Sequence, residues 1–171
     1  MKADNLTFLI VISCGLIIAL GSYLATQFTT FEDSEIWIYR GLWISELAGF
    51  FMLILNGTFI KTRFFKILNG AAALIIVGAL FKIMHWQYAD LLLTMGLIGT
   101  ILIYFLSFLK KPLKKRLDFL KLTWVIVAFA IAILRFAHLI GEEYQVLSST
   151  LIWLAIIDYL KMQKEKGRLF S

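Results

Sequence analysis

One long apolar segment of this chain closes with Leu80-Phe81-Lys82-Ile83-Met84-His85-Trp86, and a second closes with Ile133-Leu134-Arg135-Phe136-Ala137-His138-Leu139. Lys82 aligns with Arg135 and His85 with His138, each 53 residues apart and without a gap. Because both pairs end long apolar runs, the pattern predicts two membrane helices that carry their cations at one depth. Ionisable groups inside a bilayer are energetically costly, which makes these positions candidates for a functional site.

The composition indicates a membrane protein. The chain has 171 residues, of which 61% are hydrophobic, and its mean hydropathy is +0.86. Soluble domains are only about half apolar. The chain contains one proline, so long uninterrupted helices are easily formed. We therefore expect an all-α, polytopic membrane protein that forms a single transmembrane domain over residues 1–171, with no soluble domain.

A helix needs about 20 apolar residues to cross a bilayer. The sequence predicts six such spans, at residues 6–28, 41–60, 66–86, 90–109, 119–140 and 144–160. We expect the first span to be retained rather than cleaved, because its apolar stretch is longer than the core of a usual signal peptide. The connections are short, so consecutive helices should pack antiparallel.

The charged residues predict how these helices are oriented. Alternate connections are basic, with Lys61, Arg63, Lys66, Lys110, Lys111, Lys114, Lys115, Arg116 and Lys121, as is the tail with Lys161, Lys164, Lys166 and Arg168. The others are acidic, with Glu32, Asp33, Glu35, Asp90, Glu142 and Glu143. Cytoplasmic loops carry the excess of lysine and arginine, so both termini should be cytoplasmic.

The net charge of +6 arises from the basic ends. A binding site for anionic lipid or nucleic acid is one interpretation of these ends. Membrane topology together with contact to lipid headgroups is the simpler one, and it is the interpretation that we favour. We expect the lipid bilayer to be a partner of this chain and nucleic acid not to be one.

The 53-residue match extends beyond the cationic pair. Asp90 falls opposite Glu143, and Gly96 falls opposite Ser149. Residues 66–109 and 119–160 are therefore predicted to be two copies of one helical hairpin. The hairpin at residues 6–60 is a candidate third copy, which lacks the pair of cation and histidine.

Five ionisable residues form the candidate site, a polar cluster in the outer half of the membrane: Glu46, Lys82, His85, Arg135 and His138. We expect Thr94, Ser148 and Ser149 to enter the same layer. Each histidine should share a helix face with its cation, because positions i and i+3 lie on one face. Three roles are open for this cluster: interhelical contacts that fix the bundle, an ion-conducting or coupling site, and a site for a cofactor or lipid headgroup.

Two histidines on facing helices are also able to ligate haem, and with Glu46 they would supply three metal ligands. The sequence contains no third histidine and only one cysteine. We therefore expect neither a metal nor another cofactor.

The segment Gly70-Ala71-Ala72-Ala73-Leu74-Ile75-Ile76-Val77-Gly78-Ala79-Leu80-Phe81-Lys82-Ile83-Met84-His85-Trp86 resembles the first membrane helix of the GldL-type gliding-motility proteins of Bacteroidota. The resemblance extends more weakly to Lys111. It implies a bacterial inner-membrane protein related to the proton-driven motor of gliding and type 9 secretion. By the same resemblance, Lys82 and His85 occupy positions that matter to the polar core of that motor.

This chain differs from the family pattern in places that bear on function. The family carries a glutamate in its second membrane helix, where this chain has Thr100, and we expect the family's long cytoplasmic region to be absent. The hypothesis is therefore a non-catalytic accessory or scaffold subunit of a larger envelope complex that contacts other membrane or periplasmic proteins. The alternative is a proton or ion pathway through the polar cluster.

Overall fold

A computed structural model of the protein describes residues 5–28 and 34–165. Within these residues the secondary structure is entirely helical, which confirms the all-α prediction. The α-helices are α1 (Asn5–Phe28), α2 (Ser34–Leu55), α3 (Arg63–Ile83), α4 (Ala89–Lys110), α5 (Arg116–Phe136) and α6 (Gln145–Glu165), and two 3-10 helices are η1 (Phe59–Lys61) and η2 (Glu142–Tyr144). Of the charged residues used to orient the chain, Glu32, Asp33, Lys166 and Arg168 lie outside the described residues.

Five helices, α1 to α5, are long and apolar enough to cross a membrane. They correspond to the first five predicted spans, and they confirm a helical membrane protein. Helix α6 is as long as α3 and α5 but carries several polar residues, among them Gln145, Ser148, Ser149 and Asp158. The sixth span stays a prediction.

The described residues divide into two compact units. The first unit holds the residues up to Gly57 together with those from Glu142 onward, and therefore contains α1, α2 and α6. The second unit runs from Thr58 to Gly141 and contains α3, α4 and α5. The predicted hairpin at 66–109 falls in the second unit, and that at 6–60 falls in the first except for residues 58–60, whereas 119–160 contributes one helix to each unit. The hairpin repeats themselves stay a prediction.

In the first unit, α1 and α2 cross at very small distances. A Cβ atom added to Gly41 would lie 2.6 Å from both the backbone nitrogen of Ala19 and the carbonyl oxygen of Gly15. Small residues allow helix backbones to approach closely in membranes, where there is little hydrophobic driving force for association. The side chains of Asn5 and Asn56 are joined by a hydrogen bond of 2.8 Å, so the start of α1 lies beside the end of α2 and the two helices are antiparallel.

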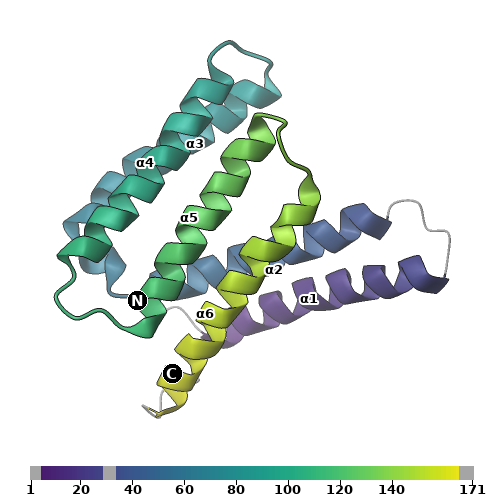
Figure 1. Cartoon of the computed structure of the whole chain (residues 1–171), viewed down its shortest axis with the longest axis horizontal. Helices are drawn as coiled ribbons and strands as arrows, with labels where there is room; N and C mark the ends of the chain where they lie inside the picture. The colour runs from purple at the N-terminus through teal and green to yellow at the C-terminus, as the bar shows by residue number, and fades with distance from the viewer. Residues whose placement is uncertain (1–4, 29–33, 166–171) are drawn as a thin grey trace. The chain divides into compact units, whose positions relative to one another are not determined.

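In the second unit, α4 packs against both α3 and α5 (Figure 1). Glycines again mark the closest approach of α3 and α4. A Cβ atom on Gly78 would lie 2.8 Å from the Leu93 nitrogen, and one on Gly96 would lie 2.6 Å from Cγ1 of Ile75. By contrast, Gly70 has no neighbouring atom within 4 Å of such a Cβ. Glycine is therefore sterically required at two of these positions but not at the third.

Helix α2 differs most from its predicted bounds, since residues 41–60 were expected and Ser34–Leu55 is observed. The helix ends early because Asn56 and Gly57 form a turn, in which the Gly57 amide donates to the Ile54 carbonyl at 3.0 Å. It also begins early, and this places Glu46 near the middle of the helix instead of near its start.

Candidate functional site

Glu46 lies in the interface between α2 and α6. Its side chain is only 6% exposed. Three side chains of α6 donate hydrogen bonds to its Oε2 atom: Gln145 through Nε2, and the hydroxyls of Ser148 and Ser149, each at 3.1 Å. These donors belong to the first turns of α6, where the helix dipole also favours a negative charge. The first unit thus contains a buried carboxylate with several neutral donors.

Ser45, the residue before Glu46, makes a further polar contact between α2 and α6. The Ser45 hydroxyl donates to the Leu42 carbonyl at 2.8 Å and accepts from the indole Nε1 of Trp153 at 3.3 Å. One turn further, Gly49 makes room for α6, because a Cβ atom there would lie 2.5 Å from Cδ1 of Ile156. Residues 46 and 49 on α2 therefore meet successively later residues of α6, so the two helices run parallel.

A second polar network joins α1, α2 and α6 at the end of these helices away from Glu46. Oδ1 of Asn5 accepts hydrogen bonds from Asn56 at 2.8 Å and from the Tyr159 hydroxyl at 3.2 Å. The Tyr159 hydroxyl in turn accepts from Nε2 of Gln163 at 2.9 Å. Asn5 and Tyr159 are buried, so this network fixes the register of α1, α2 and α6 at the end away from Glu46.

In the second unit, the first pair of cation and histidine forms the end of α3. The helix ends at Ile83, and His85 adopts the left-handed conformation with a φ of 54°. The His85 amide donates to the Lys82 carbonyl at 3.2 Å, and the Trp86 amide donates to the Phe81 carbonyl at 2.9 Å. These are the two hydrogen bonds of a Schellman motif, in which a left-handed residue closes the helix. The Phe81 and Trp86 rings add the apolar contact of the motif, with centroids 4.9 Å apart.

The second pair ends α5 in the same way. His138 has a φ of 56°, its amide donates to the Arg135 carbonyl at 2.9 Å, and the Leu139 amide donates to the Leu134 carbonyl at 2.9 Å. The prediction that each histidine shares a helix face with its cation was therefore wrong, because the helix has already ended where the histidine lies. Both histidine side chains are exposed. The repeated pattern describes a repeated helix terminus.

Lys82 and Arg135, the cations of the two pairs, are half-buried. Lys82 forms an ion pair of 2.7 Å with Asp90, at the start of α4. Its ammonium group also lies 5.0 Å from the centre of the Phe136 ring, at the end of α5. The ends of α3 and α5 are therefore neighbours, and the depth of Lys82 and Arg135 in a membrane stays a prediction. Arg135 makes contacts of its own.

The structure thus describes the five candidate residues in two groups. Glu46 belongs to the first unit and accepts hydrogen bonds from Ser148 and Ser149, two residues that were expected in the same layer. Lys82, His85, Arg135 and His138 belong to the second unit, whose Thr94 is half-buried on α4. The cluster of all five residues stays a prediction.

Gln145 is the partner that sequence reasoning missed. It lies three and four residues before the two serines that contact Glu46, which places all three side chains on one helix face. That spacing was the available signal.

The chemistry of the described residues is limited. They contain no group of three histidine, cysteine, aspartate or glutamate side chains that is able to hold a metal ion. Thr100 is buried, and its hydroxyl donates to the Gly96 carbonyl at 2.9 Å. Thr100 is therefore part of the helix packing in α4, whereas the buried carboxylate of Glu46 lies on α2.

These features define a class: an α-helical membrane protein with polar groups buried between its helices. A family model, the GldL N-terminal domain, matches residues 67–124. This match confirms the resemblance to GldL-type proteins, and it covers less than half of the chain. It extends past α4 into α5. No curated protein and no solved structure matches the chain.

Proposed function

We propose that this chain is a non-catalytic inner-membrane subunit of a larger envelope complex linked to gliding or type 9 secretion. In this proposal the unit from Thr58 to Gly141 is a GldL-like module that contacts the complex, and both termini lie in the cytoplasm. The helices α1, α2 and α6 form a second module specific to this chain.

One observation carries this proposal. The residues that match the GldL N-terminal domain, 67–124, fall entirely inside one of the two compact units. The matched residues therefore lie within one structural unit and do not extend into the other one. The faces of α3 and α4 that are exposed within that unit are strongly apolar, with Ile76 and Leu102 more than half exposed, and membrane partners bind to such faces through close packing.

Purification from native membranes in a mild detergent, followed by mass spectrometry, tests this proposal. We expect envelope proteins to co-purify in constant ratio with the chain. A disruptive variant replaces Gly96 by leucine. This change should disturb the packing of α3 against α4 and lower the yield of co-purified partners. A stable, monodisperse chain that brings down no other protein would contradict the proposal.

A second candidate, a proton or ion pathway, is favoured by the burial of Glu46. A carboxylate buried in a helix interface is able to bind a proton or a small cation, and ionisable residues at membrane depth often mark such pathways. In proteoliposomes, wild-type protein should then carry an ion flux that Glu46→Gln abolishes. Glu35→Gln, at an exposed carboxylate of the same helix, should leave the flux intact. Absence of flux in the wild type would contradict this candidate.

A further inference from the structure

We propose that the end of the second unit formed by η1, the start of α3 and the loop from α4 to α5 binds the headgroup of an anionic phospholipid. The juxtaposition of exposed lysines, an aromatic layer and a fixed loop carries this inference. It goes beyond the proposed subunit role and does not depend on it.

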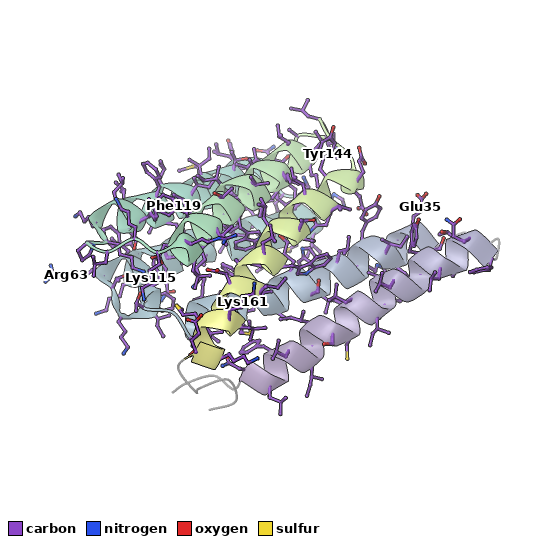
Figure 2. The ribbon with its side chains drawn as sticks, turned by 60° about the horizontal axis from the view of Figure 1, so that its bottom comes forward. Glu35, Arg63, Lys115, Phe119, Tyr144 and Lys161 are labelled. Carbon is purple, nitrogen blue, oxygen red and sulfur yellow. The ribbon has the colours of Figure 1, made fainter. Side chains whose placement is uncertain are left out.

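Charge is the first observation. This end carries nine basic residues, Lys61, Arg63, Lys66, Lys110, Lys111, Lys114, Lys115, Arg116 and Lys121, and its one acidic residue is Asp118. Contacts between the helices bring these residues to the same end, because the Lys110 ammonium at the end of α4 lies 5.3 Å from the centre of the Phe64 ring at the start of α3. Figure 2 shows Arg63 and Lys115 at this end of the helices. Such a concentration of positive charge fits a phosphate group.

Aromatic rings hold two of the lysines in place. Besides the contact of Lys110 with Phe64, the Lys114 ammonium lies 5.0 Å from the centre of the Phe108 ring. Phe108 itself packs edge-on against Phe119, with centroids 4.9 Å apart. An ammonium group has three N–H donors, so contact with one ring face leaves donors for other partners, and both lysines are exposed. The two ammonium groups are therefore positioned but still able to donate to a phosphate.

The loop between α4 and α5 is fixed by Asp118. One of its carboxylate oxygens accepts from the Lys111 ammonium at 2.6 Å, and the other accepts from the Lys115 backbone amide at 2.9 Å. Asp118 thus neutralises Lys111 and anchors the first turn of α5. The neighbouring Lys110 and Lys114 have no such acidic partner in this loop, whose other charges are positive.

The apolar neighbours of these lysines favour a lipid over a soluble anion. Leu113, next to Lys114, is 78% exposed, and Leu109 and Phe119 are more than half exposed. Exposed apolar side chains next to lysines are typical of the membrane interface, where acyl chains cover the former and headgroups meet the latter. The ligand that satisfies both features is a phosphate group attached to acyl chains.

Native mass spectrometry of the whole protein tests this inference. The detergent-solubilised chain is titrated with phosphatidylglycerol and, separately, with phosphatidylcholine of the same acyl chains. The variant carries Lys110→Gln and Lys114→Gln. The matched control carries Lys161→Gln and Lys164→Gln, which removes the same charge from exposed lysines of α6.

We expect the wild type to retain phosphatidylglycerol over phosphatidylcholine. The first variant should bind it about 10-fold to 30-fold more weakly, since each lysine that contacts the headgroup contributes about 1 kcal/mol. The control removes no lysine of this site and should bind as the wild type does. Equal weakening in both variants, or no preference between the lipids, would overturn the inference. Displacement of the lipid by soluble glycerol phosphate at similar concentration would also overturn it, because the site would then recognise a free phosphate, and displacement by short RNA would assign the surface to nucleic acid.

Discussion

Both units of this chain contain a close helix crossing at glycines, but the first unit also has a polar interface between two of its helices. In the first unit, α2 and α6 enclose a buried carboxylate and several hydroxyl and amide groups. In the second, α3 and α4 meet through glycines and aliphatic side chains, and their ion pair between Lys82 and Asp90 lies at the exposed end. Packing of small residues suffices for helices to associate in lipid, so the polar interface of the first unit is the feature that calls for a function or a structural role of its own.

The largest effect should come from Glu46. Replacement by alanine removes the acceptor of three hydrogen bonds, and each interhelical hydrogen bond in a membrane protein contributes roughly 0.6–2 kcal/mol. We expect a loss of about 2–4 kcal/mol in the free energy of unfolding, measured in SDS titrations by circular dichroism. Hydrogen exchange should rise in α2 and α6 but not in α3 and α4.

Glu46→Gln serves as the control for this prediction, because its amide oxygen still accepts hydrogen bonds, whereas the charge is lost and the second acceptor oxygen becomes an NH2 donor. It should be less destabilising than alanine. An alanine variant as stable as the wild type would show that the polar interface does not hold the first unit together.

Gly96 tests the apolar interface of the second unit. A methyl group at this position would meet Cγ1 of Ile75 at 2.6 Å and the carbonyl oxygen of Ala71 at 3.0 Å. We expect Gly96→Ala to lower stability by about 1–3 kcal/mol, as overpacked cores do. Gly70→Ala is the matched control, since the added methyl meets nothing, and it should raise stability by up to about 1 kcal/mol through helix propensity. Equal behaviour of the two variants would contradict the close crossing of α3 and α4.

The histidines at the helix ends should show a smaller effect of opposite sign. A residue other than glycine in the left-handed conformation is disfavoured by about 1–2 kcal/mol. We therefore expect His85→Gly to raise the thermal midpoint of unfolding by a few degrees, whereas His85→Ala should give no such gain. A drop in stability with glycine would mean that the imidazole makes contacts which outweigh the backbone strain.

The smallest effect should come from Asp90. Its ion pair with Lys82 is partly exposed, and exposed pairs contribute about 0–1 kcal/mol. Asp90→Asn should thus lower stability by no more than that, and the difference should disappear at high salt. A larger loss would place this pair among the main contacts of the second unit.

Much of the fold follows from the sequence, because long apolar runs leave a helix as the structure that satisfies its own backbone in lipid. The contact of Glu46 with Ser148 and Ser149 was also predictable, since polar side chains at similar depth find one another. The role of His85 and His138 was not. Periodicity places residues on a helix face only while the helix continues, and nothing in the pattern of lysine and histidine marks the change to positive φ. Glycine usually occupies such a position, so a histidine there does not indicate the end of the helix.

Photo-crosslinking in the native membrane tests the central claim most directly. A photoreactive amino acid is placed at Ile76 or Leu102, which lie in the GldL-like unit and are 61% and 55% exposed, and at Ile17 or Leu20 of α1, which are 69% and 62% exposed. We expect adducts with envelope proteins from the first two positions and none from the two in α1. Adducts at equal frequency from both units, or from neither, would contradict the assignment of the GldL-like unit as the part that contacts the complex.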